Sequence, residues 1–471
     1  MHTRALSLAI AATASLLILV ACTGSDGGSP ERADRDSTPA TTSLPATEDG
    51  ERGEAEAPPT PQDANPPTRA DGDADETSTA IELGPLEAMP QEPDSGPGEG
   101  RGFVAGLDTS FRSVDLADVH FDLFNGSTVS LADAPVDVIL ALRDLIPPLD
   151  ASRALLPADV RERVGEVAYI RHENATFLQP ANIVLGYVAD DGQAYAYSLG
   201  ILNSHEIVNE TLGGRAVVIT YCPLCASGVV YDRVVGGEVL TFGNTSALYQ
   251  NDLVMLNRQT GSYWFQVGGE AVVGPLTGAR LPPLPSTLAP FGDWVADHPD
   301  TLVLSTDTGF TDRRYDGGSF TDTAQFVDQG FFGFPIDQEI VDDSRLSSGE
   351  LVLALNTGES AVAYPLNTLG DAALNTTFAG QEIVLFSSAA GLTGNAFDRR
   401  LNGERLTFRV EGGAYRDDQT NSIWTLSGLA SGGPLAGSQL SQIPSRTAFW
   451  FSIRAAFPEV TVAGLDEADG A

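Results

Sequence analysis

Two cysteines with two residues between them are the part of the sequence best suited to chemistry. Cys222 and Cys225 lie in the segment Tyr221–Ala226. Two thiols at this spacing can close into a small disulfide ring and exchange it with another thiol. They can also bind a metal ion, because thiolates are ligands of zinc and of Cu(I). A third interpretation is a structural disulfide, or two buried thiols, without activity.

His205 is the histidine that we expect to work with this pair. As a neighbour it would tune the pKa of a thiol, and as a ligand it would bring a metal-binding set to three. A closed zinc site needs four ligands, and the sequence has no second cysteine pair. The fourth position would be open or taken by Asp252, Glu206 or Met255. The metal interpretation therefore adds Asp252 to the two cysteines and His205, with copper or zinc as the ion.

The cysteine pair belongs to one copy of an internal repeat. Ala216–Phe242 aligns without gaps on Glu382–Phe408; both segments contain an Asp-Arg pair and end in Leu-Thr-Phe. Such self-similarity indicates two related structural units. The second copy places other residues where the first has its cysteines and histidine: Ser388, Gly391 and Asp371. Since shared residues mostly maintain a duplicated fold, we expect a single site, on the first unit.

Both copies have the pattern of β structure. Val217–Tyr221 is a short apolar run rich in β-branched residues, which is typical of a buried strand. Gly236–Gly237 in the first copy and Asn402–Gly403 in the second occupy matching positions, and both favour a two-residue hairpin turn. Helices should be few and short, for example around Phe291–Asp297. We predict a mainly β chain of two tandem related antiparallel units, which disfavours a thioredoxin-like fold.

The amino terminus has the pattern of a bacterial lipoprotein signal. A short basic start is followed by a run of small and apolar residues from Ala5 to Val20. This run is shorter than a typical transmembrane helix. Cys22 follows small residues, so we expect it to become the acylated first residue of the mature protein. Two acyl chains hold a protein stably on a membrane. The sequence thus predicts a lipid-anchored protein on the extracytoplasmic side of the cell membrane.

The chain is strongly acidic, with 26 basic and 64 acidic residues and a formal net charge of −38. A chain this acidic lacks the positively charged surface that binds the phosphates of nucleic acid, so nucleic acid is excluded as a partner. Residues 23–100 contain no aromatic residue and much of this acid. They cannot bury enough apolar surface to offset the entropy of ordering, so we predict a disordered tether.

These features divide the 471 residues into six segments. They are a lipoprotein signal peptide (1–21), a disordered acidic Pro-rich tether (22–100), the N-terminal segment of the globular domain (101–179), β repeat unit one with the CxxC site (180–310), a connection (311–344) and the degenerate β repeat unit two (345–465).

Several segments resemble, in the right order, the motifs of the bacterial domain-of-unknown-function family 3179, a family of exported CxxC-containing proteins. The segments are Ile146–Asp150, Ala194–Leu199, Asn203–Glu206, Asn209–Thr211, Thr220–Cys225, Leu240–Gly243 and His298–Leu302, within a match of about 140–465. The family often has an aromatic residue where Ser204 stands and a glycine where Ala226 stands. Some relatives are selenoproteins, and a selenocysteine in this motif would imply redox chemistry.

Three functions remain open from the sequence. The first is an exported, lipid-anchored thiol–disulfide oxidoreductase that uses Cys222, Cys225 and His205 with an unidentified redox partner in the envelope. The second is a copper- or zinc-binding module that uses the same residues without turnover. The third is a non-catalytic envelope binding or scaffold protein whose cysteines only staple a turn.

Overall fold

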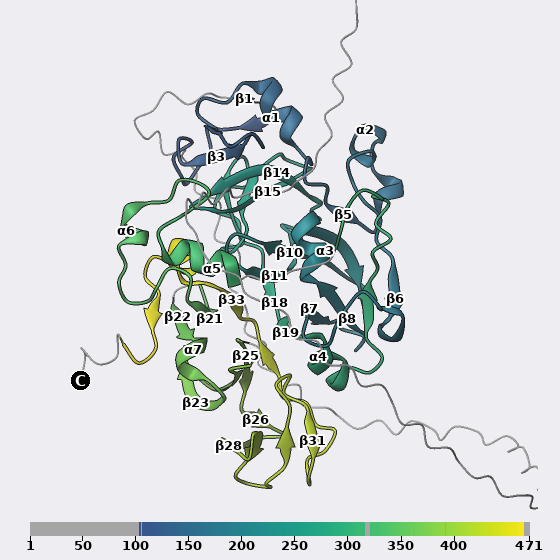
Figure 1. The fold of residues 1–471 in the computed structure, drawn as a ribbon, viewed down its shortest axis with the longest axis vertical. Helices are drawn as coiled ribbons and strands as arrows, with labels where there is room; N and C mark the ends of the chain where they lie inside the picture. Colours follow the sequence, from purple (N-terminus) through teal and green to yellow (C-terminus); the bar gives the residue numbers. More distant parts are fainter. Residues whose placement is uncertain (1–102, 105, 316–320, 359, 391, 466–471) are drawn as a thin grey trace, which may run out of the picture. The chain divides into compact units, whose positions relative to one another are not determined.

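The computed structural model describes residues 103–104, 106–315, 321–358, 360–390 and 392–465. The predicted signal peptide, Cys22 and the tether lie outside these residues, and so does Gly391. The described chain is mainly β, as predicted, with mostly antiparallel strand pairing and helices of eight residues or fewer (Figure 1).

The N-terminal segment supplies edge strands and short helices. Its elements are β1 (Phe103–Val104), β2 (Leu107–Asp108), β3 (Val119–Asp122), β4 (Thr128–Ser130), α1 (Val136–Leu142), β5 (Leu149–Asp150), α2 (Ala158–Arg161) and β6 (Tyr169–Arg171), with 3-10 turns at Arg153–Leu155 and His172–Asn174.

The next part of the chain, up to residue 304, contains the cysteine pair. Its elements are β7 (Ile183–Val188), β8 (Ala194–Ser198), α3 (Leu199–His205), β9 (Ile207–Leu212), β10 (Arg215–Cys222), β11 (Ser227–Asp232), β12 (Val234–Val235), β13 (Glu238–Val239), β14 (Phe242–Tyr249), β15 (Asp252–Asn257), β16 (Tyr263–Phe265), β17 (Glu270–Val273), β18 (Pro283–Leu284), β19 (Thr287–Pro290), α4 (Phe291–Asp297) and β20 (Leu302–Leu304). The helix expected around Phe291–Asp297 is α4.

The C-terminal part repeats this order of elements after two connecting helices, α5 (Thr321–Asp328) and α6 (Gln338–Val341). Its elements are β21 (Leu351–Asn356), β22 (Ala361–Pro365), α7 (Leu366–Leu369), β23 (Ala372–Phe378), β24 (Gln381–Ser388), β25 (Thr393–Asp398), β26 (Arg400–Leu401), β27 (Glu404–Arg405), β28 (Phe408–Glu411), β29 (Ala414–Asp417), β30 (Ile423–Trp424), β31 (Ala430–Gly432), β32 (Gln442–Ile443), β33 (Arg446–Phe449), α8 (Trp450–Ala456) and β34 (Thr461–Val462).

Strand pairing repeats as well. The antiparallel order β9-β10-β11 recurs as β23-β24-β25, and the parallel pair β8–β20 recurs as β22–β34. Both small hairpins, β12–β13 and β26–β27, turn through residues with positive φ, Gly236–Gly237 and Asn402–Gly403. A two-residue turn of this kind matches the twist of the strands it joins.

A strand of the second repeat pairs with a strand of the first. β33 of the second repeat pairs with its own β21 and also with β11 of the first, which joins strands of both repeats into the sheet β34-β22-β21-β33-β11-β10-β9-β5. In the reciprocal position, the hydroxyl of Thr393 on β25 donates to the carbonyl oxygen of Leu288 on β19. The cysteines therefore lie where the repeats meet.

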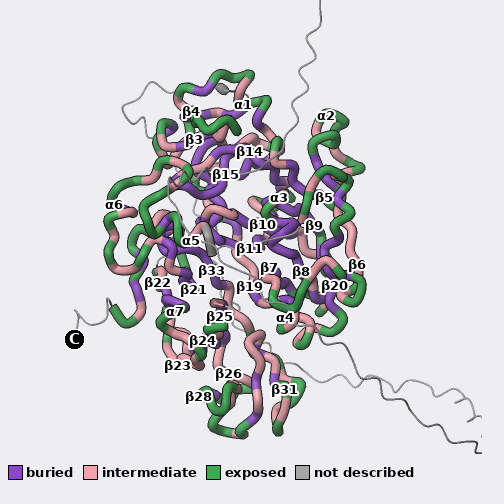
Figure 2. Tube along the Cα trace, in the orientation of Figure 1, coloured by how far each residue is buried: buried purple, intermediate pink, exposed green. Residues whose placement is uncertain are grey.

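A continuous apolar core fills this junction. Strands β10 and β11 are buried along almost their whole length (Figure 2). Both cysteines belong to a cluster that includes Phe449 and Phe451 of the second repeat and Val327 and Ile340 of the connection. Three separate parts of the chain thus enclose the cysteine pair.

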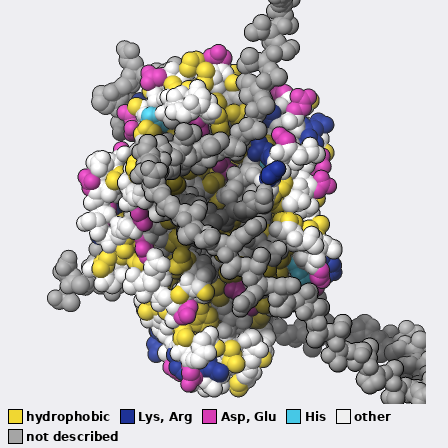
Figure 3. Space-filling view, viewed as in Figure 1, with side chains coloured by type: hydrophobic (Ala, Val, Ile, Leu, Met, Phe, Trp, Pro, Cys, Tyr) yellow, Lys and Arg dark blue, Asp and Glu magenta, His cyan; other side chains and the backbone are white. Residues whose placement is uncertain are grey.

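The surface carries scattered acidic side chains. On the face drawn in Figure 3 they are spread over many elements rather than gathered over one. Among the residues that the structure describes, no helix is long and apolar enough to cross a membrane.

Candidate functional site

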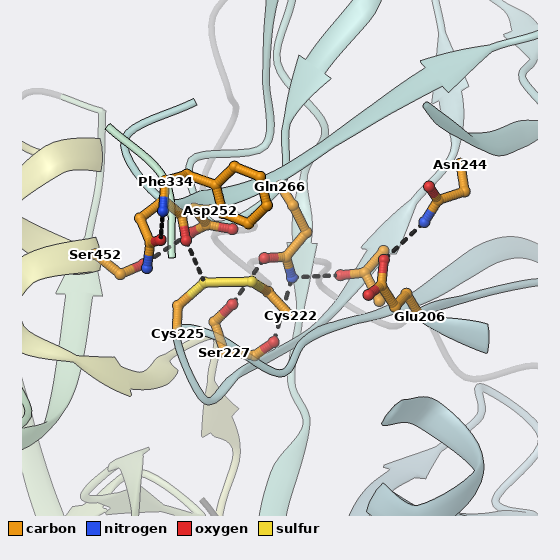
Figure 4. Close-up of a disulfide and its surroundings, with 11 residues drawn as sticks. Glu206, Cys222, Cys225, Ser227, Asn244, Asp252, Gln266, Phe334 and Ser452 are labelled. Atoms are coloured by element: carbon orange, nitrogen blue, oxygen red, sulfur yellow. Dashed lines mark hydrogen bonds between the residues drawn. A yellow bond between two sulfur atoms is a disulfide. The ribbon is translucent and has the colours of Figure 1, made fainter. Parts of the chain in front are cut away.

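Cys222 and Cys225 form a disulfide at the turn between β10 and β11 (Figure 4). Cys222 is the last residue of β10 and lies opposite Ser227, the first residue of β11. Their antiparallel pairing brings the chain back on itself, so the Cα atoms of the cysteines are 5.5 Å apart. This separation is ordinary for a disulfide. Both side chains are buried, with at most 1% of their surface exposed.

Residues in unusual backbone conformations surround the disulfide. Ala226 directly after it has a φ of 52°, Glu206 a φ of 59°, and Gln250 and Asn251, which precede β15, have φ values of 51° and 60°. A residue other than glycine in this left-handed region of backbone conformation destabilises the fold by about 1 kcal/mol or more. Such strain concentrates at functional sites. The positive φ at Ala226 also explains why glycine suits that position.

Asp252 lies beside the disulfide. A carboxylate oxygen of Asp252 and the two sulfurs all lie within 4.8 Å of one another. The hydroxyl of Ser452, on α8 of the second repeat, donates to its Oδ2 at 2.7 Å. Burial raises the pKa of the Asp252 carboxyl to about 7, although the hydrogen bonds from the Ser452 hydroxyl and from the Leu253 backbone oppose this.

A second buried acid and a buried amide complete a polar region in the core. Glu206 accepts a 2.7 Å hydrogen bond from the side-chain amide of Asn244, and burial raises the pKa of its carboxyl to about 7. The amide of Gln266 bridges two strands, since it accepts from the hydroxyl of Ser227 at 2.7 Å and donates to Thr220 at 2.8 Å. Buried polar groups usually need such partners, so each position is closely specified.

His205 faces a different part of the molecule. Its Nδ1 donates to the carbonyl oxygen of Pro147 at 2.7 Å, and its Nε2 accepts from the hydroxyl of Tyr315 at 2.8 Å. Burial lowers the pKa of its imidazole to about 4, so the ring is neutral near pH 7. Among the described residues, the group close enough to share an ion contains Cys222, Cys225 and Asp252 and does not include His205.

Of the remaining proposed ligands, Met255 lies in the same apolar cluster as the cysteines, and Glu206 is occupied by Asn244. The structure thus brings together Asp252 and the two cysteines from the residues that the sequence singled out. The chemical role of each residue stays a prediction.

The connection between the repeats covers the site, which the sequence did not predict. We call residues 323–341 the cover segment. The backbone amide of Phe334 donates to the side chain of Asn251 at 3.0 Å, and that of Asp337 donates to Gln250 at 2.8 Å. The ring of Phe332 packs edge-on against Phe451 with centroids 5.2 Å apart. The sequence feature that could have indicated this contact is the group of phenylalanines at 331, 332 and 334, which is unusual for an exposed linker.

The second repeat lacks the polar region. Alignment of the two repeats places apolar residues opposite Thr220, Glu206, Asn244 and Gln266, namely Phe386, Ala372, Val410 and Leu426. The hairpin β28–β29 is shorter than β14–β15, so the second repeat has no strand residue that corresponds to Asp252. The polar groups are therefore not needed to build the repeated fold, which marks the first repeat as the place where they serve another purpose.

A family model described as "Protein of unknown function (DUF3179)" matches residues 163–460. The chain belongs to this family. The match includes the first repeat, the second repeat up to its last strand, the cover segment and every residue of the polar region around the disulfide. No curated protein and no solved structure matches the chain.

Proposed function

We propose that this member of the family is an exported, lipid-anchored thiol–disulfide redox protein whose active pair is Cys222 and Cys225. The observation that carries the proposal is a disulfide at CxxC spacing inside a buried polar region that the second repeat lacks. Membrane attachment would come from acylated Cys22, which belongs to the sequence-based part of the proposal.

A purely structural disulfide explains the arrangement less well. Closing a loop of only four residues stabilises a fold by about 2 kcal/mol in the chain-entropy model, less than half the value for a long loop. Buried acids beside the disulfide add a cost, because burial disfavours their charged forms. A staple would not need them, and the equivalent turn in the second repeat is built without them.

The reaction is a two-electron exchange with a dithiol of an envelope partner. A partner thiolate attacks one sulfur of the protein disulfide, the Cys222–Cys225 bond breaks, and the other sulfur leaves as a thiolate. The second partner thiol then resolves the mixed disulfide. The partner ends as a disulfide, the protein ends as two thiols, and two protons pass from the partner's thiols to the protein's thiols.

His205 enters this proposal as a packing residue rather than as a participant. Its hydrogen bonds to Pro147 and Tyr315 hold the segment before β5 and the segment after β20 against α3. The sulfurs would therefore exchange without its direct help.

Metal binding is the second candidate function. The observation that favours it is the grouping of Cys222, Cys225 and Asp252 within 4.8 Å. After reduction, two thiolates and one carboxylate would offer three ligands, and the soft sulfurs suit Cu(I) or zinc. An ion held there would make the protein a metal-binding module.

The test combines redox cycling with metal analysis on the full-length protein purified without air. We expect the Cys222–Cys225 pair to be reduced by dithiothreitol and reoxidised by oxidised glutathione while the protein stays folded and binds no stoichiometric metal. Cys222→Ser and Cys225→Ser should each abolish cycling, whereas Ser388→Ala, the matched change in the second repeat, should not. Bound metal near one equivalent would instead support the copper- or zinc-binding function. If the disulfide is reduced only when the protein unfolds, the cysteines form a structural disulfide without redox activity.

A further inference from the structure

A single glutamine connects both strands of the turn that carries the disulfide. Gln266 directly follows β16 and is fully buried. Its Oε1 accepts a hydrogen bond from the hydroxyl of Ser227 at 2.7 Å, and its Nε2 donates to the hydroxyl of Thr220 at 2.8 Å and, at 3.4 Å, to the carbonyl oxygen of Ser227. We call these contacts the glutamine bridge; Figure 4 shows the amide of Gln266 beside the disulfide.

The glutamine bridge reaches the chain on both sides of the disulfide. Thr220 lies on β10, two residues before Cys222, and Ser227 begins β11, two residues after Cys225. Gln266 comes from the end of a strand that belongs to a different sheet. In addition to their backbone pairing, the two arms of the turn are therefore held by the sulfurs and by a neutral amide that does not depend on the sulfurs.

The amide is itself held in place by other contacts. The backbone N–H of Gln266 donates to the carbonyl oxygen of Leu253 at 3.0 Å, and its carbonyl oxygen accepts from the hydroxyl of Tyr231 at 2.7 Å. The hydroxyl of Thr220 donates in turn to the carbonyl oxygen of Val229 at 2.8 Å. These bonds involve no sulfur atom, so opening of the disulfide removes no partner from the glutamine bridge.

Opening of the S–S bond removes a cross-link from the turn. The freed side chains and backbone gain conformational entropy, which lowers the effective concentration of one sulfur at the other. A second connection between the two arms limits this loss. We propose that Gln266 is a positioning residue that keeps Cys222 and Cys225 close enough to re-form their bond after reduction. This inference rests on the redox function proposed above.

The step that depends on this positioning is the closing of the pair. When one cysteine is bound to a partner in a mixed disulfide, the thiolate of the other cysteine attacks the bonded protein sulfur. The Cys222–Cys225 bond forms, the bond to the partner breaks, and the partner sulfur leaves as a thiolate. That thiolate takes up one proton, which balances the proton that the attacking thiol has lost. Because the reaction is intramolecular, its equilibrium constant rises with the effective concentration of the two sulfurs.

The second repeat has neither the pair nor the glutamine bridge. Leu426 stands opposite Gln266, and Phe386 stands opposite Thr220. Neither side chain can form a hydrogen bond, and the corresponding turn contains Ser388 in place of a cysteine. The glutamine bridge therefore occurs in the copy that has two sulfurs to position.

The experiment equilibrates the full-length protein with mixtures of reduced and oxidised glutathione at about pH 7 without air. Acid quenching, alkylation and mass spectrometry of the peptide that holds Cys222 and Cys225 give the amounts of disulfide, dithiol and mixed disulfide with glutathione. At a fixed concentration of reduced glutathione, the ratio of disulfide to mixed disulfide measures the effective concentration of the sulfurs. Gln266→Leu, which copies the second repeat, should lower this ratio about 10-fold and make the reduction potential about 30 mV less negative.

Two further variants separate positioning from the general effect of losing a bridging side chain. Ser227→Ala removes one contact of the glutamine bridge and should lower the same ratio by a smaller factor, which keeps the test available if Gln266→Leu does not fold. Gln442→Leu removes a glutamine of the second repeat whose amide donates to Ser286 and Thr287. It should leave the ratio and the reduction potential at the parental values.

A merely structural glutamine would stabilise the oxidised and the reduced protein equally. Its loss would then lower both melting temperatures and leave the ratio and the reduction potential unchanged. This result in a folded Gln266→Leu or Ser227→Ala protein would overturn the inference while the redox function stands. A parent disulfide that opens only on unfolding would instead overturn the redox function.

Discussion

The backbone amide of Phe449 donates a hydrogen bond, 2.9 Å long, to the carbonyl oxygen of Cys225. Phe449 ends β33 of the second repeat, and Cys225 belongs to the turn that carries the disulfide in the first. Two residues further on, Phe451 packs in the cluster that encloses both sulfurs. The second repeat therefore has a use despite its lack of a reactive pair: it completes the wall of the site and supplies Ser452.

Opening of the cover segment should control access to the disulfide. Phe332 is half-buried against Phe451, and such an aromatic pair is worth about 0.5–1.5 kcal/mol beyond its buried area. We expect Phe332→Ala to raise the rate of disulfide reduction in the folded protein about 10-fold, since about 1.4 kcal/mol corresponds to a factor of ten. Alkylation and mass spectrometry after reduction measure this rate.

Phe331→Ala is the matched control, because the neighbouring Phe331 is 64% exposed. Its reduction rate should equal that of the parent. Equal rates for the parent and Phe332→Ala would show that the sulfurs are reached by a route that does not involve the cover segment.

Ala226 holds a conformation that glycine adopts at less cost. With a φ of 52° it lies in the left-handed region, where a Cβ atom is unfavourable. Ala226→Gly should raise the free energy of unfolding by about 0.5–1 kcal/mol, measured by urea denaturation of the oxidised protein. Ala247→Gly, within strand β14, tests the opposite case, because Ala247 does not have a positive φ, and it should lower the free energy of unfolding. A loss of stability in Ala226→Gly would contradict the argument from strain.

The membrane anchor rests on sequence alone and has a direct test. Cys22→Ala removes the residue that would carry the acyl chains, which are the proposed attachment to the membrane. The variant should move from the membrane fraction to the soluble fraction after cell lysis and centrifugation. A variant that still sediments with membranes would refute lipidation at this residue.

The fold was predictable where the signals are local. The turns at Gly236–Gly237 and Asn402–Gly403, and helix α4 at Phe291–Asp297, each depend on residues close together in the chain. The pairing of β33 with β11 of the other repeat has no such signal. Its pairing partner β11 lies more than 200 residues earlier, so only the packed structure brings Gly228 opposite Thr447.

The site was predictable in part for the same reason. The CxxC spacing and its loss in the second copy pointed to Cys222 and Cys225, and Asp252 follows them closely in sequence. The orientation of His205 could not be read from its neighbours, because Pro147 and Tyr315 are far away along the chain. A buried ring bonds to whatever polar group the packing presents, so its type alone did not reveal its partners.

Burial of Glu206 should make the stability of the protein depend on pH. The pKa of its carboxyl rises from 4.5 to about 7 in the folded state, because burial disfavours the charged form. The folded protein then holds this proton over a pH range in which the unfolded chain has lost it. The resulting stabilisation is fully present below pH 4.5, declines as pH rises and is gone above about pH 7.

Glu206→Gln should remove this decline, because an amide of the same shape does not titrate and can still pair with Asn244. Between pH 4.5 and pH 7.5 the parent should lose about 3 kcal/mol of unfolding free energy relative to the variant, as the pKa rise implies. Urea denaturation at each pH gives both curves. Glu404→Gln, at an exposed position on β27, should run parallel to the parent. If the difference between the parent and Glu206→Gln stays constant over this range, the carboxyl does not change its protonation state on folding, and the acid beside Asn244 is charged in the core.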